Sequence, residues 1–499
     1  MAKKMLPLAM LTGALLAATS AGAQPSGTFR QAHAVGSGAA SDVDPMSRGR
    51  VFEIVDKIMS RLVRPDMQGK PSPDLALSWE SNAGATEWTF RLRPGVTFHN
   101  GQPFGAEDVV YSISRVLDPR VDSPVRAVIA MVERAEVVDP LTVRLVLKEP
   151  FADMPLQLTD YRLRIIPRNS GDTIRQTGIG TGPFRLDRLD ASGTTVLLAN
   201  PNYHGGAPRV ARMEVVGIPD GQARLQALLG GQLDMEPGIT RQQKTLLDRT
   251  GRHRVIEVPT GNWRGIVFKV DVPPFNDVRV RRAIRMAVDR QAVLDLVAGG
   301  AGVIGCDTPV GPTDQYRLEQ IPARDCPRDL VRARALLAEA GHPNGIQFDL
   351  NVATLEPVWP TLAEAFQQQV AAAGIRVNIV QVPSDGYWNQ VWLRRDAVMT
   401  RWNQRPADAI LNEVYRSGSP WNESRQASPE FDRILDAARR ELDAEKRTAL
   451  YRQAQRFLAE NTGTFVAFHA NVFMGTTARV QDLDAVEYFS IRWHLVRVN

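Results

Sequence analysis

The stretch from residue 348 to residue 382 most strongly limits the folds open to this chain. Its pattern predicts a strand over 348–353, a helix capped by Thr361 and ended by Gly374, and a second strand over 375–382. A strand, a helix and a strand in this order form a βαβ unit, whose two strands are parallel. The second half of the chain continues to alternate strands and helices, whereas the first half is richer in hairpins.

A turn-rich stretch over residues 181–206 predicts an antiparallel hairpin. One face of its first strand carries Phe184, Leu186 and Leu189, residues 191–193 form the turn, and Pro201 ends the second strand. No reactive side chain stands on this hairpin, so the pattern favours a structural role.

Several helices have clear start signals. A helix is predicted over residues 106–117, with acidic residues in its first turn. Side chains that can accept hydrogen bonds from the first turn precede five other helices: Asp220, Asp277, Asp329, Ser428 and Asp443.

The N-terminus has the pattern of a secretory signal peptide over residues 1–23. Lys3 and Lys4 precede an apolar run, and Ala21 and Ala23 give a small-residue cleavage site. No later apolar run reaches the roughly 18 residues of a membrane-spanning helix. With 60 Lys and Arg against 55 Asp and Glu and no basic stripe, nucleic-acid binding is not expected. The remaining chain is long enough for about three domains or two large lobes.

The two cysteines, Cys306 and Cys326, flank a segment rich in Pro and Gly. In an exported chain, this pair is expected to form one disulfide rather than two free thiols.

Motifs for catalysis or cofactor binding are weak. Residues 300–305 match G-x-G-x-x-G, but they follow a helix instead of opening one, so a dinucleotide site is not expected. The seven histidines are scattered without metal-ligand spacing, and no G-x-S-x-G elbow occurs. We expect no catalytic residue, no metal and no cofactor. A secreted hydrolase is the alternative, because the residues of a catalytic triad can be far apart in the sequence and come together only in the folded protein.

Residues 385–422 hold four of the nine tryptophans, interleaved with Arg, Asn, Asp and Glu. These aromatic side chains can belong to a core. They can also form the wall of a ligand site, with rings for stacking, a carboxylate for an ammonium and arginines for a carboxylate.

The order of four segments resembles the extracellular solute-binding proteins of family 5, the peptide, nickel and opine receptors of bacterial ABC importers. The matching segments are WTFRLRPGVTFHNGQPFGAEDVVYSISRVLDP (88–119), GTGPFRLDRLD with NPNYHGGAP (180–208), PFNDVRVRRAIRMAVDRQAV (274–293) and SPWNESRQASPEFDRILDAARRELDAEKR (419–447).

The resemblance implies an α/β fold with two lobes, in the Venus-flytrap arrangement of periplasmic binding proteins. Lobe I would span 24–259 with a return over 475–499 and an extra hairpin-rich subdomain, and lobe II would span 260–474. Two hinge crossings would lie near 260–264 and 470–475, and the 181–206 hairpin would lie near the lobe interface. Ligand would favour the closed form, which docks on a membrane permease.

The resemblance also implies a periplasmic, monomeric receptor that is not an enzyme. Its ligand would be a peptide-like or amino-acid-derived solute, with a nickel chelate, an opine or a sugar as the alternatives. Such receptors hold a ligand ammonium with an Asp shortly after a Trp, which matches Trp402 and Asp408. The region 353–360 lacks the Arg that dipeptide receptors use, and Glu356 stands there instead.

Arg405 or Arg401 would then bind a ligand carboxylate. The resemblance adds Asn403, Tyr161, Asn262 and Trp263 as further ligand contacts.

Overall fold

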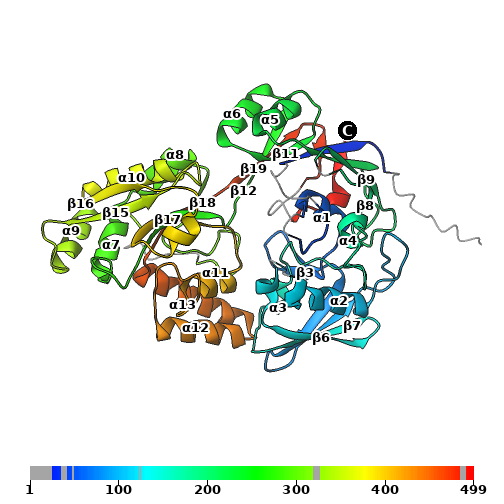
Figure 1. Ribbon diagram of the computed structural model, residues 1–499, viewed down its shortest axis with the longest axis horizontal. Coiled ribbons are helices and arrows are strands. Elements are labelled where there is room, and N and C mark those ends of the chain that lie inside the picture. The colour runs from blue at the N-terminus through cyan, green and yellow to red at the C-terminus, as the bar shows by residue number, and fades with distance from the viewer. Residues whose placement is uncertain are drawn as a thin grey trace, which may run out of the picture.

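The computed structural model describes residues 25–34, 42–47, 50–121, 123, 125–190, 192–318, 326–483 and 490–499. The expected signal peptide lies outside these residues. The chain folds into two lobes that lie side by side, with the N-terminal and C-terminal strands in the same lobe (Figure 1). The two-lobed α/β fold expected from the sequence is therefore confirmed.

The first lobe is built on a seven-stranded sheet in the order β12-β19-β11-β1-β10-β9-β8. Strand β1 pairs in parallel with β10 and β11, and the other pairs are antiparallel. The strands are β1 (Thr28–His33), β8 (Phe184–Arg188), β9 (Thr194–Ala199), β10 (Arg212–Gly217), β11 (Met235–Ile239), β12 (His253–Val258) and β19 (Val472–Thr477). The helices of this part are α1 (Phe52–Ile58), α4 (Ile174–Thr177), α5 (Gly221–Leu229) and α6 (Arg241–Thr250).

The predicted hairpin is confirmed as β8 and β9, with Phe184 fully buried. Its expected place near the lobe interface is wrong. Strand β8 is the edge strand opposite β12, and β12 and β19 are the strands that lead to the second lobe. The hairpin extends the sheet on the far side, which explains why it needs apolar residues on one face and no ligand-binding group.

A second, four-stranded antiparallel sheet forms the extra hairpin-rich subdomain of the first lobe. Its order is β4 (Ala76–Ser81), β5 (Glu87–Leu92), β7 (Thr142–Leu147) and β6 (Val132–Asp139). Helix α2 (Ala106–Leu117) has the predicted bounds and packs its apolar side on this sheet, with Val109 and Ile113 buried. The short helix α3 (Met154–Gln157) follows β7 and faces the second lobe (Figure 1). Shorter strands are β2 (Val63–Pro65), β3 (Pro71–Pro73), β20 (Val480–Gln481) and β21 (Arg497–Val498).

The second lobe contains a six-stranded sheet in the order β14-β18-β13-β17-β15-β16. Its strands are β13 (Trp263–Phe268), β14 (Gly302–Ile304), β15 (Ile346–Val352), β16 (Ile375–Gln381), β17 (Ala397–Trp402) and β18 (Thr464–Ala470). Its helices are α7 (Val278–Met286), α8 (Arg290–Ala298), α9 (Leu330–Glu339), α10 (Trp359–Ala371), α11 (Ala407–Tyr415), α12 (Pro429–Arg440) and α13 (Ala444–Asn461).

The predicted βαβ unit is confirmed, because β15 and β16 are parallel and α10 connects them. Thr361 is not the cap of α10. The helix starts at Trp359, with Val358 at the cap position and Pro360 in the first turn. Proline fits the first turn because the amide groups there have no partner within the helix.

The chain passes between the lobes twice, over residues 259–262 and at Asn471. The two crossings are tied together by hydrogen bonds. Thr260 Oγ1 donates to the carbonyl oxygen of Ala470 at 2.7 Å, and the Ala470 amide donates to the carbonyl oxygen of Asn262 at 2.7 Å. The crossings therefore form one paired connection rather than two independent linkers.

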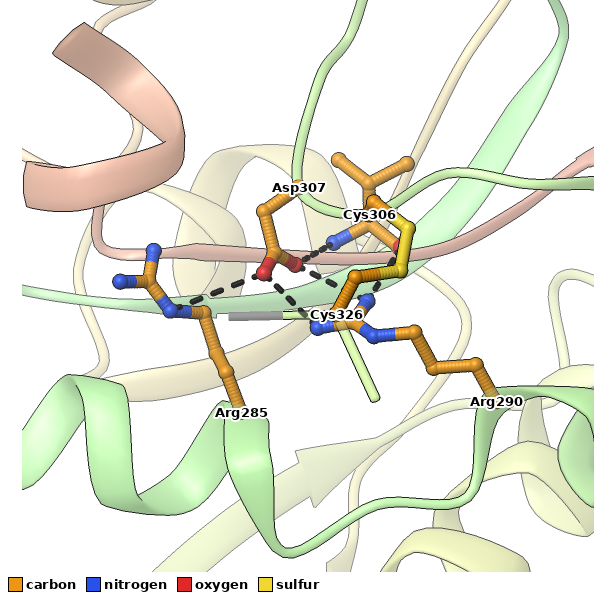
Figure 2. The surroundings of a disulfide bond; sticks show 6 residues. Arg285, Arg290, Cys306, Asp307 and Cys326 are labelled. Carbon is orange, nitrogen blue, oxygen red and sulfur yellow. Dashed lines mark hydrogen bonds and ion pairs between the residues drawn. A yellow bond between two sulfur atoms is a disulfide. The ribbon is translucent and has the colours of Figure 1, made fainter. Parts of the chain in front are cut away.

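Cys306 and Cys326 are joined by a disulfide, with Cα atoms 5.3 Å apart. Figure 2 shows the buried carboxylate of Asp307 beside it. Arg290 binds this carboxylate through two nitrogens at 2.8 and 3.1 Å, and Arg285 Nε lies 3.6 Å away. The disulfide loop is thus anchored to α7 and α8 by a buried ion-pair cluster.

Candidate functional site

A cavity of about 350 Å³ lies between the lobes. Such a volume is in the range of sites for small organic ligands. The first lobe contributes Pro65, Gly69, Leu156, Gln157, Thr159, Asp160, Tyr161, Arg162 and Val472, and the second lobe and first crossing contribute Thr260, Asn262, Thr313, Asp314, Gln315, Asn403, Gln404, Arg405 and Pro406. Because both lobes line it, a ligand in this cavity contacts both at once.

On the side of the cavity nearest the crossings, the side-chain amides of Asn262 and Gln404 bind the backbone. Asn262 Oδ1 accepts a hydrogen bond from the Gln404 amide at 2.8 Å, and Gln404 Oε1 accepts from the Gly261 amide at 2.7 Å. Gly261 also packs against Gly311, so closely that a Cβ atom on Gly311 would lie 2.5 Å from the Gly261 Cα. Hydrogen bonds and close backbone contact therefore fix the crossing relative to the loop after β17.

Two arginines face the cavity, one from each lobe. Arg162, in the first lobe, forms a two-point ion pair with Asp160 at 2.6 and 2.8 Å. Burial raises the pKa of Asp160, but the hydrogen bonds and the charge of Arg162, together with the charge of Arg61, outweigh burial and leave the pKa below its usual value. Arg405, in the second lobe, is held more loosely, with Nε 3.5 Å from Glu413 Oε2 and Nη1 3.4 Å from the Gln404 carbonyl oxygen. Arg405 therefore has more capacity to bind a ligand anion.

Asp314 reaches the cavity from the loop that the Cys306–Cys326 disulfide closes, and its carboxylate caps helix α11. Its carboxylate accepts hydrogen bonds from the amides of Tyr316 at 2.8 Å and of Ala407, the first residue of α11, at 2.9 Å. Burial raises the pKa of Asp314 to about 6 despite these donors. Asp314 thus fixes the start of α11 next to Arg405.

Tyr161 stands on the first-lobe wall beside a second ring and several charges. Its ring meets that of Phe52 edge to face, with centroids 4.8 Å apart, and Arg50 covers the other aromatic ring at 4.3 Å. Burial raises the pKa of Tyr161, and the nearby Arg162 partly offsets this rise. The wall therefore offers an aromatic surface next to a positive potential.

The structure brings four of the eight predicted ligand residues to the cavity: Tyr161, Asn262, Asn403 and Arg405. It places the other four elsewhere. Trp263 and Trp402 are paired in neighbouring strands and buried, and Trp402 Nε1 donates to the buried Glu423 at 3.2 Å. These two tryptophans are core residues of the second lobe.

Glu356 lies outside the cavity wall and binds two arginines, Arg264 at 3.0 Å and Arg401 at 2.7 Å. Arg401 is thereby committed to Glu356, so of the two arginines predicted for a ligand carboxylate only Arg405 faces the cavity.

Asp408 is also buried and is not part of the cavity wall. Arg439 binds both oxygens of its carboxylate, at 2.9 and 3.0 Å. Tyr451 and Asn412 donate further hydrogen bonds to Oδ1, at 3.0 and 2.9 Å. The carboxylate expected to bind a ligand ammonium is thus fully engaged within the protein.

Sequence reasoning missed Asp160, Arg162, Asp314 and Gln404. The first two flank the predicted Tyr161 in the sequence, and an acid and a base two residues apart in a loop were a usable signal. Asp314 gave no such signal, because its role depends on a helix that starts 93 residues later.

Two searches of the described residues give negative results. No group of three or more His, Cys, Asp or Glu side chains is arranged to hold a metal ion. None of the helices among these residues is long and apolar enough to cross a membrane.

Comparison with known proteins gives consistent matches over most of the chain. Di/tripeptide-binding protein 2 of Pseudomonas aeruginosa is 29% identical over 443 residues, which cover 80% of this chain and 81% of the relative. Heme-binding protein A of Haemophilus influenzae is 27% identical over 451 residues, which cover 82% of this chain and 81% of the relative.

Among solved structures, HbpA2 from Haemophilus parasuis matches with a TM-score of 0.85 at 24% identity, over 95% of this chain and 100% of the other. The periplasmic binding protein DppA of Helicobacter pylori, solved with the peptide STSA, matches with a TM-score of 0.72 at 23% identity, over 95% of this chain and 98% of the other. These likenesses support the two-lobed fold.

The family model for bacterial extracellular solute-binding proteins, family 5, matches residues 70–422. This region includes the first crossing and residues of both walls of the cavity. The chain therefore belongs to the bacterial extracellular solute-binding proteins of family 5, and it is a binding protein rather than an enzyme.

Proposed function

We propose that this protein is the periplasmic, monomeric receptor of an ABC importer and that it binds a peptide-like or amino-acid-derived solute in the cavity between its lobes. The signal-peptide pattern of residues 1–23 supports export. The names of the relatives support the ligand class, since several are di/tripeptide-binding or dipeptide-binding proteins. The loaded, closed protein then delivers its solute to a membrane permease.

We further propose that the lobes move about the paired crossings at residues 259–262 and Asn471. The ligand favours closure because it gains contacts with both walls only when the lobes are together. The moving bodies of this proposal follow the expected boundaries, 24–259 with 475–499 for one lobe and 260–474 for the other, except at the second crossing. Strand β19 starts at Val472 and pairs with β12, so residues 472–474 move with the first lobe.

The observation that carries the ligand proposal is the guanidinium group of Arg405. It lies on the second-lobe wall with a side chain 27% exposed and only long contacts to Glu413 and Gln404. An arginine with free N–H groups suits a carboxylate, because its planar fork can donate two parallel hydrogen bonds. Asn403 and Asn262 beside it supply amide groups for a peptide backbone.

The test compares two arginine variants in the same segment. Arg405→Gln is expected to weaken the binding of glycyl-leucine by about 2 kcal/mol, roughly 30-fold in Kd, because a charge-assisted hydrogen bond is lost. Arg401→Gln serves as the matched control, since Arg401 is bound to Glu356 outside the cavity. Isothermal titration calorimetry measures both.

Equal affinities of the Arg405→Gln variant and the unaltered protein would contradict the role of Arg405. Native mass spectrometry of gently purified protein tests the receptor function independently, because a small molecule retained between the lobes is released intact on denaturation.

A further inference from the structure

The lobes touch at a second place, on the side of the cavity away from the crossings. The connection from β7 to α3, residues 148–153, lies against α12 and α13 of the second lobe (Figure 1). The amide of Ala152 donates to the carbonyl oxygen of Arg439 at 2.7 Å. Leu156, in α3, packs in the same apolar cluster as Tyr316 and Val414 of the second lobe. We call residues 149–156 the docking segment.

Arg439 is the centre of this contact. Its Nη1 donates to Glu149 Oε1 of the docking segment at 3.1 Å, and its guanidinium lies 5.6 Å from the centre of the Phe151 ring. On the other side, its Nε and Nη2 are bound by the carboxylate of Asp408. Burial lowers the pKa of Arg439, but the Asp408 carboxylate more than offsets this and raises it above its usual value.

A second ion pair joins the lobes beside the first. Asp153 of the docking segment accepts a hydrogen bond from the Tyr316 hydroxyl at 2.6 Å and lies 3.0 Å from Arg447 Nε. Arg447 Nε also donates to the Tyr316 hydroxyl at 2.8 Å. Tyr316 and Arg447, which both contact the Asp153 carboxylate, belong to the second lobe.

The carboxylate of Asp408 is too engaged to serve a ligand as well. It receives two bonds from Arg439, one from Tyr451 and one from Asn412. A ligand ammonium would have to displace Arg439 and leave that guanidinium buried beside Glu149 alone. Removing one partner of a buried ion pair is strongly unfavourable.

We propose that Asp408 is a positioning residue. It holds Arg439 in the orientation that binds the docking segment of the other lobe, and it thereby sets the population of the closed form. A receptor that binds only when closed has an apparent Kd equal to its intrinsic Kd divided by the closed fraction. Loss of this contact therefore weakens the binding of every ligand by the same factor, whatever group the ligand carries at its N-terminus.

The first measurement needs no ligand. Small-angle X-ray scattering compares the ligand-free protein with the Asp408→Asn variant, for which we expect a larger radius of gyration. Asp436→Asn is the matched control, because Asp436 lies on the same helix as Arg439 and pairs at 2.6 Å with Arg416 of the same lobe.

A second variant covers the case in which Asp408→Asn fails to fold. Glu149 is 57% exposed, so Glu149→Lys leaves the folded lobes intact while placing a lysine against Arg439. We expect the same increase in radius. Glu133→Lys, at a residue paired with Arg134 in its own strand, carries the same change of charge as the control. Unchanged radii in both Glu149→Lys and any folded Asp408→Asn protein would overturn the proposal.

The second measurement rests on the proposed function and uses glycyl-leucine and its N-acetyl form. A tenfold smaller closed fraction raises both Kd values tenfold. A loss confined to the peptide with the free ammonium would overturn the proposal and make Asp408 a direct ligand contact. If neither peptide bound the unaltered protein, the proposed ligand class would fail, while the scattering measurement would still decide the role of Asp408.

Discussion

At the residue scale, the carboxyl group of Asp153 makes the contact between the lobes sensitive to pH. Asp153 is 4% exposed and is faced by Arg447, Tyr316, Asp408 and Tyr451. Burial raises its pKa from 3.8 to about 6, although Arg447 and Tyr316 oppose this rise. The folded protein therefore binds this proton more tightly than the unfolded chain does. Asp153 contributes stability that is complete below about pH 4 and is lost as the pH rises through about 6.

The variant Asp153→Asn removes this titration. From pH 7.5 to pH 4.5, the unfolding free energy of the unaltered protein should rise relative to that of Asp153→Asn by on the order of 2 kcal/mol. Urea denaturation at both pH values measures the difference, and the other titrating groups cancel because both proteins contain them. A difference that stays constant between the two pH values would show that Asp153 is ionised throughout.

The fold requires a glycine at position 311, because there is no room for a side chain there. A Cβ atom there would lie 2.5 Å from the Cα of Gly261, which is backbone and cannot move without displacing the crossing. We expect Gly311→Ala to lower the melting temperature and to weaken ligand binding, measured by differential scanning calorimetry and titration. Gly221→Ala is the control, since the nearest atom to its Cβ would be Arg224 Nη2 at 3.4 Å. Equal behaviour of the two variants would refute the requirement.

Only four of the eight residues predicted to bind a ligand reach the cavity, and the reason is local geometry. Trp402 and Asn403 are neighbours, but Trp402 is buried in the core while Asn403 reaches the cavity. Asp408 and Arg405 belong to one short motif, and Asp408 turns toward Arg439, 31 residues away in the sequence. Spacing places a residue on an element, but the side that faces the ligand is decided by partners that are distant in the chain.

At the element scale, the helix starts were predictable because the signal is short-range. The caps at Asp220, Asp277, Asp329, Ser428 and Asp443 are all confirmed, each accepting hydrogen bonds from amides in the first turn. Helix α11 is the instructive exception. Pro406 precedes it and gives no side-chain cap, and Asp314 supplies the acceptor from another loop. Local sequence rules cannot identify a cap that comes from a distant segment.

The disulfide belongs to the same scale, because it closes the loop that follows β14. In the chain-entropy account, a ring of this length stabilises the folded protein by about 3 kcal/mol. Reduction, or the double variant Cys306→Ser with Cys326→Ser, should therefore lower the melting temperature. The buried Asp307 cluster keeps the start of the loop anchored to Arg290 after reduction, so we expect the folded lobe to survive. An intact mass that shows two free thiols in the native protein would contradict the stabilising role of the disulfide.

At the scale of the whole molecule, the crossings and the docking segment both connect the lobes, and the cavity lies between these two contacts. The crossings pair through Thr260 and Ala470, and the docking segment meets Arg439 and Arg447 on the other side. The resemblance of four sequence segments predicted the lobes and the crossings. It did not predict the docking segment, because that contact joins residues about 290 positions apart through side chains that carry no motif.

A ligand held by both lobes should stabilise both lobes against heat. Binding to the folded state alone adds RT ln(1 + [L]/Kd), which is about 2.7 kcal/mol at a free concentration of 100 times Kd. Because Tyr161 and Arg162 line one wall and Asn403 and Arg405 the other, glycyl-leucine should raise the unfolding temperature of both lobes in differential scanning calorimetry. Arg405→Gln should show a smaller rise at the same peptide concentration. If only one lobe were stabilised, the ligand would bind to that lobe alone and the cavity between the lobes would not be its site.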